Sequence, residues 1–208
     1  QAELACVTLD VGRAGQVPAA ARRDCGRVRT FALRDPNADV YGSGIGKQGQ
    51  GIRFHAAAQG LDRDFRLGMP GLFNVDNALA AIAVCRGLGI PEKAMATGLE
   101  RARVPGRMEV FTSADGGVTA IVDYAHNRMS FETLFQSVRA EYPGRLIVAV
   151  FGCPGRKAFD RRRTLAEASG QASALVVPTE ADSAEDVTRY IRRGTAGPVS
   201  AHSSPYHI

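Results

Sequence analysis

Short apolar runs alternate with amphipathic helical segments along most of the 208-residue chain, and no other feature limits the possible folds as strongly. Helical spacing is clear between residues 74 and 87, where Val75, Leu79 and Ile82 fall on one face. Strands separated by helices of this length form βαβ units and a mostly parallel sheet. The sequence therefore predicts an α/β fold. The expected strands lie at residues 4–9, 28–33, 118–122, 146–151 and 174–177.

Residues 42–67 depart from this alternation. The segment is rich in glycine and then alternates apolar and polar residues, which predicts antiparallel strands with a turn near Gly60. Residues 44–49 suggest a phosphate-binding loop, but Tyr41 stands where that motif requires Gly, and Gln48 where it requires Ser or Thr. We therefore expect residues 44–49 to form an ordinary loop.

The composition excludes several classes of protein. With 45% hydrophobic residues the chain is globular, and no run approaches the roughly 18 apolar residues that span a membrane. The net charge of +5 comes mostly from arginine and suits an anionic small ligand as well as it suits DNA, and no nucleic-acid-binding motif accompanies it. The four cysteines show no metal or disulfide spacing, which indicates reduced thiols. We expect a cytoplasmic protein without membrane or nucleic-acid partners and without a metal site in this chain.

Candidate functional residues follow the predicted strands, because ligands of parallel sheets bind at the carboxyl ends of the strands. Asp123 and His126 are close enough in sequence to face one ligand; alternatively, an Asp or Asn here caps the next helix. Gly152 and Gly155 would let backbone N–H groups approach an anion. The basic residues after them strengthen this interpretation, although taken alone they are more typical of a solvated helix end.

Four motifs in register resemble the Mur ligases, most closely the branch that adds the third amino acid of the peptidoglycan stem peptide. They are Gly71–Asn77, Gly106–Glu109, Val122–Asn127 and Val150–Cys153. The resemblance implies that residues 1–104 are the end of a central ATPase-type α/β domain. It also implies that residues 105–208 are a truncated, Rossmann-like C-terminal domain with a mostly parallel sheet, joined to the first by a hinge near Pro105.

The resemblance further implies an ATP-dependent amide ligase that works through an acyl phosphate, with UDP-MurNAc-dipeptide and an amino acid as substrates. By motif match, Asn74 and Asn77 would lie near the adenine, Arg107 would reach the phosphates, and Asp123 and His126 would contact the nucleotide. The phosphate loop, the Mg²⁺ ligands and the catalytic residues are expected in segments that precede this chain. Alone, the chain should therefore not catalyse.

The amino-acid site is expected near Lys157, Glu180 and Asp182. Family members that use meso-diaminopimelate carry an Asp-Asn-Pro-Arg motif, whereas the matching place here begins at Asp182 and continues with Ser and Ala. The arginine that pairs with the distal carboxylate is thus missing. A substrate without a second carboxylate, such as L-lysine or L-ornithine, fits this sequence better.

Two alternatives remain open. Folylpolyglutamate and cyanophycin synthetases share the Asp-x-Ala-His-Asn motif, although Gly106–Glu109 favours the Mur branch. The other alternative is a non-catalytic module that binds a nucleotide or an amino acid. Micromolar binding of ATP or an amino acid by this chain would favour such a module, whereas half of a ligase cleft should bind ATP in the millimolar range or not at all.

Replacing Lys157 tests the predicted amino-acid site. We expect Lys157→Ala in the ligase to raise KM for the amino acid far more than KM for ATP, because the lost ammonium group would face only the amino acid. Steady-state kinetics with each substrate varied in turn measure both constants. Equal effects on the two would remove Lys157 from that site.

Overall fold

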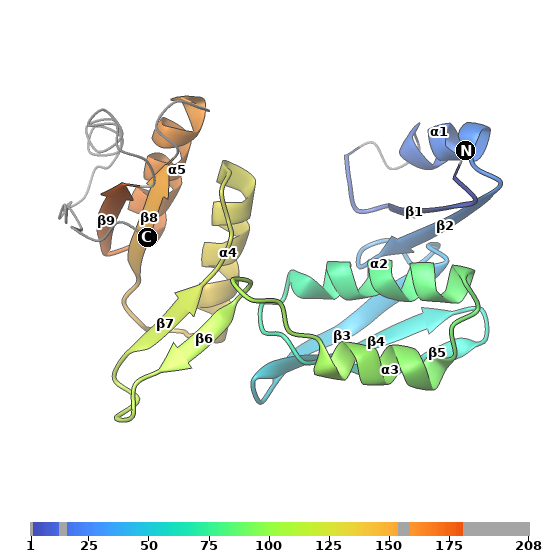
Figure 1. Cartoon of the computed structure of the whole chain (residues 1–208), viewed down its shortest axis with the longest axis horizontal. Coiled ribbons are helices and arrows are strands. Elements are labelled where there is room, and N and C mark those ends of the chain that lie inside the picture. The colour runs from blue at the N-terminus through green and yellow to red at the C-terminus, as the bar shows by residue number, and fades with distance from the viewer. Residues whose placement is uncertain (1, 13–15, 154–158, 181–208) are drawn as a thin grey trace. The chain divides into compact units, whose positions relative to one another are not determined.

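The computed structural model describes residues 2–12, 16–153 and 159–180, and these form two compact units, residues 1–123 and 124–208 (Figure 1). Helices and strands mix in both, which confirms the predicted α/β class. Within the described ranges, no helix has the length and apolarity needed to cross a membrane.

The first unit contains a five-stranded sheet in the order β1-β2-β3-β4-β5. The first three strands are parallel, whereas β3, β4 and β5 are antiparallel, as the sequence predicts around Gly60. The strands are β1 (Leu4–Thr8), β2 (Arg27–Ala32), β3 (Val40–Gln48), β4 (Gly51–Ala58) and β5 (Leu61–Leu67). The helices are α1 (Gln16–Asp24), α2 (Asn74–Gly87) and α3 (Glu92–Arg101).

Helix α2 crosses the sheet over β1, β2 and β3 and supplies much of the core (Figure 1). Val75, Leu79 and Ile82, the face predicted from helical spacing, are fully buried. A glycine on β3 permits the close approach, because a Cβ at Gly42 would lie only 2.7 Å from Leu79 Cδ1. The position of α2 is therefore fixed by its packing on the sheet.

The glycine-rich segment at residues 44–49 is mostly strand, not the expected loop. It continues β3, which pairs with β4 on both sides of a bulge between Ser43 and Gly46. Gly44 lies in the bulge at φ +60°, a conformation that glycine adopts without strain. Cross-strand pairing thus outweighs the poor strand propensity of glycine here.

An antiparallel hairpin completes the first unit. Its strands are β6 (Glu109–Thr112) and β7 (Thr119–Val122). The strand expected at residues 118–122 is therefore present, but it pairs antiparallel with β6 in a two-stranded sheet and does not join the parallel strands, because a short turn links it to β6. The division between the compact units follows this hairpin, at Asp123. The domain boundary expected near Pro105 refers to the domains of the family that the chain resembles, not to the compact units of the structure. It stays a prediction.

The second unit has parallel strands covered by two helices, which is the βαβ arrangement expected here. Phe131 and Phe135 of the first helix join Ala149 and Val176 of the two strands in one core. The elements are α4 (Arg128–Glu141), β8 (Val148–Cys153), α5 (Phe159–Ala172) and β9 (Leu175–Glu180).

His55 on β4 is held between two carboxylates of β5. Its Nδ1 lies 3.1 Å from Asp64 Oδ1, and its Nε2 lies 2.7 Å from Asp62 Oδ1. Hydrogen bonds to Asp64 and Asp62 raise the pKa of His55 above its usual 6.5. Both contacts of this histidine therefore depend on its protonation, since only the imidazolium donates from both nitrogens.

We expect the His55 contacts to stabilise the folded chain at acidic pH. Because the folded pKa lies above the unfolded value, the contribution is complete below about pH 6.5 and is lost as the pH rises through the folded pKa. An NMR titration of the imidazole should give a pKa above 6.5. Asp64→Asn should lower the pKa of His55 more than Asp62→Asn does. A wild-type pKa at or below 6.5 would contradict the stabilising contacts with the two carboxylates.

Candidate functional site

The start of α2 brings the two predicted asparagines together but gives them different environments. Asn74 is 5% exposed; its Nδ2 donates to Pro70 O at 2.7 Å, and its Oδ1 accepts from Asn77 Nδ2 at 3.1 Å. Asn77 is exposed. Asn74 thus serves the local structure, and Asn77 presents the polar surface of this turn.

Residues 104–109 form a strap in which three consecutive amides have acceptors. The N–H of Gly106 donates to Glu109 Oε2 at 2.8 Å, that of Arg107 to Val104 O at 3.1 Å, and that of Met108 to Asp123 Oδ2 at 3.0 Å. Arg107 itself is exposed. The segment that carries this guanidinium is therefore fixed through its own backbone.

Met108 connects the strap to the start of α2. A Cβ at Gly71, which has φ +87°, would lie 2.9 Å from Met108 Cγ and 3.1 Å from Asn74 Nδ2. The side chains of Met108 and Asn74 thus both close over Gly71. Four predicted residues, Asn74, Asn77, Arg107 and Asp123, consequently belong to one structure within the first unit.

Asp10 and Asp76 lie at the carboxyl ends of the parallel strands. Asp10 accepts the N–H groups of Leu33 at 2.6 Å and Arg34 at 3.0 Å, which shapes the loop after β2. Burial raises the pKa of Asp76, and the Asp10 carboxylate adds to this, whereas Arg34 opposes it. Asp10 is not among the residues predicted from the sequence, although its place directly after a strand is a usable signal.

His126 lies in the second unit, in the turn that starts α4. Its Nδ1 is 3.0 Å from Tyr124 O, and its N–H donates to Ser130 Oγ at 3.1 Å. Asn127 caps α4, because its side chain accepts from the Ser130 N–H and Ser130 Oγ accepts from the Asn127 N–H. The capping alternative thus applies to Asn127, whereas Asp123 holds the strap.

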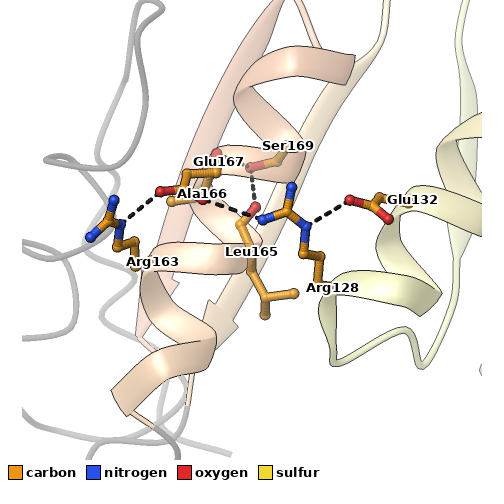
Figure 2. Close-up of polar contacts among 7 residues, drawn as sticks. All are labelled: Arg128, Glu132, Arg163, Leu165, Ala166, Glu167 and Ser169. Atoms are coloured by element: carbon orange, nitrogen blue, oxygen red, sulfur yellow. Dashed lines mark hydrogen bonds and ion pairs between the residues drawn. The ribbon is translucent and has the colours of Figure 1, made fainter.

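An ion-pair network supports α4 behind this turn. Figure 2 shows Arg128 pointing toward Glu132 on its own helix and toward Glu167 on α5, at 2.7 and 3.5 Å. Arg163 reaches the same Glu167 at 2.7 Å. Glu167 thus ties the first turn of α4 to α5 and helps to fix the backbone that carries His126.

The predicted amino-acid site cannot be assembled from the described residues. Lys157 and Asp182 lie outside them, and Glu180 ends β9 with its side chain outside them. Gly152 does lie at the carboxyl end of β8, as expected, while Gly155 is outside the described part. Within that part, no group of three His, Cys, Asp or Glu side chains is arranged to hold a metal ion.

Two family models match the chain. The Mur ligase middle domain matches residues 2–85, and the glutamate ligase domain of Mur ligases matches residues 106–206. The first match ends within α2, and the second begins at the strap.

Curated relatives come from several bacteria. The UDP-N-acetylmuramyl-tripeptide synthetase of Roseiflexus sp. is 37% identical over 74% of this chain and 30% of its own. Two further relatives are each 34% identical. They are the UDP-N-acetylmuramoyl-L-alanyl-D-glutamate–2,6-diaminopimelate ligase of Alkaliphilus oremlandii and the UDP-N-acetylmuramoyl-L-alanyl-D-glutamate–L-lysine ligase of Streptococcus agalactiae. They match 69% and 68% of this chain, and each match covers 29% of the relative. The chain therefore spans about 30% of the length of these relatives.

Solved structures share the fold. Folylpolyglutamate synthase of Mycobacterium tuberculosis has a TM-score of 0.78 at 22% identity over 96% of this chain and 45% of its own. MurF of Acinetobacter baumannii has a TM-score of 0.74 at 20% identity over 97% and 42%. At such identities the likeness concerns the fold, and it agrees with the expected central α/β domain followed by a Rossmann-like one.

Truncating the two asparagines should separate their roles. Asn74→Ala leaves Pro70 O without its donor in a buried place, so we expect a loss of about 1–3 kcal/mol in the free energy of unfolding. Asn77→Ala, at an exposed position, should change it by less than about 0.5 kcal/mol. Urea unfolding measures the free energy of unfolding of both variants. Equal losses would contradict the structural role of Asn74 and the surface role of Asn77.

Proposed function

Because the chain belongs to the Mur ligase family, we propose that it forms part of an ATP-dependent amide ligase of peptidoglycan precursor synthesis. The observation that supports this proposal most directly is that the Gly71–Asn77 and Gly106–Glu109 motifs and Asp123 join in one structure through hydrogen bonds and packing. Motif order supplies the resemblance, and this assembly supports the proposal that the motifs act together. The proposed location is the cytoplasm.

The proposed reaction has two steps. A carboxylate of the UDP-MurNAc-dipeptide takes the γ-phosphoryl group of ATP, and ADP leaves; the amine of the incoming amino acid then displaces phosphate from the acyl phosphate and forms the amide. Such transfers depend mainly on positioning and on neutralising charge. In this chain, Arg107 supplies an exposed guanidinium that can pair with phosphate oxygens.

The nucleotide-facing roles are assigned by exposure and hydrogen bonding. Asn77 offers an exposed amide to a base edge, while Asn74 holds Asn77 through its Oδ1. A contact with the nucleotide is also proposed for Asp123, which accepts from Met108 N–H, and separately for His126 of the second unit. The folylpolyglutamate synthase that shares the fold was crystallised with ADP and AMPPCP, which supports a nucleotide site in this architecture.

Mg²⁺ does not fit the described side chains. Asp10 is committed to two backbone N–H groups, and no three suitable ligands converge in the described ranges. The described part of this chain therefore supplies no metal ligand. The Mg²⁺ ligands would lie in other segments of the ligase.

We further propose that the ligase adds the third amino acid of the stem peptide. Curated relatives named as tripeptide synthetase, diaminopimelate ligase and lysine ligase support this step but name different amino acids. The missing arginine after Asp182 favours an amino acid without a second carboxylate, such as L-lysine or L-ornithine. Folylpolyglutamate-type ligation stays the alternative, supported by fold likeness alone.

The test is amino-acid-dependent phosphate release by the complete ligase, with ATP and UDP-MurNAc-L-Ala-D-Glu present. We expect turnover with L-lysine or L-ornithine to exceed that with meso-diaminopimelate. Arg107→Ala should lower kcat/KM at least about 100-fold, because a group that neutralises developing charge is lost. Arg101→Ala, which removes another exposed arginine of the same unit, is the matched control and should stay near wild type. Turnover with folate substrates only would overturn the proposal.

A further inference from the structure

Met108 has a backbone conformation that needs an explanation. Its φ is +49°, and it is the one residue other than glycine with a positive φ in the described part of the chain. It is also 1% exposed, between an exposed Arg107 and a half-buried Glu109. Strained residues of this kind persist only where the surroundings hold them, and they cluster at functional sites.

Two independent restraints hold Met108. Its N–H donates to Asp123 Oδ2 at 3.0 Å, across the hairpin β6–β7. Its side chain fills the space above Gly71, where an added Cβ would lie 2.9 Å from Met108 Cγ. The backbone restraint thus comes from one end of the hairpin, and the packing restraint comes from the turn before α2.

These restraints act on residues that face outward. Arg107 lies between two residues whose amides donate to carboxylates, and its own N–H donates to Val104 O. Asn74 borders the same space above Gly71 as Met108 and Phe73, and it accepts from Asn77 Nδ2. A shift of Met108 would therefore be felt at Arg107 and at Asn77 alike.

We propose that Met108 is a positioning residue that fixes Arg107 and Asn77 relative to each other. The inference rests on the proposed function, in which these two residues meet one nucleotide. Met108 touches neither the nucleotide nor the reacting atoms; it acts by holding the strap to the start of α2. Fixing two contact groups before the ligand arrives lowers the ordering cost of binding.

Hydrogen exchange of the chain itself tests the positioning. In Met108→Ala, we expect the backbone amides of residues 107 and 108 to exchange at least about tenfold faster than in the wild type. We also expect the NMR signals of the Asn77 side-chain amide to shift. Met108→Leu keeps most of the volume and should restore the wild-type pattern. Met95→Ala is the matched control, since Met95 is equally a buried methionine, 5% exposed, but lies in α3.

The control separates positioning from general loss of stability. Met95→Ala should lower the melting temperature while leaving exchange at Arg107 within about twofold of wild type. The proposal is overturned if Met108→Ala leaves that exchange unchanged, or if Met95→Ala accelerates it as much. Should Met108→Ala fail to fold, the exchange at Arg107 is compared between Asp123→Ala and Asp123→Asn. Only Asp123→Asn keeps a side-chain acceptor for Met108 N–H, so the proposal requires faster exchange in Asp123→Ala, and equal exchange in the two variants would overturn it.

Kinetics of the complete ligase separate this inference from the proposed function. We expect Met108→Ala to lower kcat/KM for ATP at least about tenfold relative to Met95→Ala, with rescue by Met108→Leu. If the ligase turns over but Met108→Ala and Met95→Ala have equal kcat/KM for ATP, the positioning role fails and the proposed function stands. If no amino acid is ligated, the proposed function fails, and hydrogen exchange alone decides whether Met108 holds the strap.

Discussion

The packing of α2 on the parallel part of the sheet is the constraint on which the site in the first unit depends. Leu79 lies directly over Gly42, where an added Cβ would come within 2.7 Å of Leu79 Cδ1, so the glycine permits the close approach of the helix. The position of the helix decides where its first turn, with Asn74, meets the preceding chain. The turn at Gly71 then leaves one space, which Met108 and Asn74 share. The core thus sets the geometry of residues that are not in it.

Carboxylates that accept backbone N–H groups shape the segments around this turn. Asp10 holds the loop after β2, Glu109 holds Gly106, and Asp123 holds Met108. Such loops have no ladder partners for their amides, so a side-chain acceptor replaces the missing backbone acceptor. A charged acceptor also makes the bond stronger than a neutral one would be. The polar residues at strand ends therefore serve the backbone first and are available to a ligand second.

Periodicity predicted what local sequence controls. The apolar spacing gave α2 and its buried face correctly, and the strand alternation around Gly60 gave the β4–β5 hairpin. It did not give β3 through Gly44, because the pairing that holds this glycine-rich strand comes from β4. Likewise, nothing near Asn74 in sequence indicates that it is buried beside Met108 above Gly71, since Met108 is far along the chain. Non-local contacts account for both differences.

The same contacts explain why a motif match does not by itself assign a role. Asn74 and Asn77 occur in one motif, yet the amide of Asn74 is used internally and that of Asn77 faces outward. Arg107 and Met108 are neighbours in another motif, and alternate side chains point outward and into the core. A motif in this chain is therefore a unit of packing in which some residues present chemistry and others hold them in place. Exposure and hydrogen-bond partners, rather than the spacing of letters, separate the two kinds.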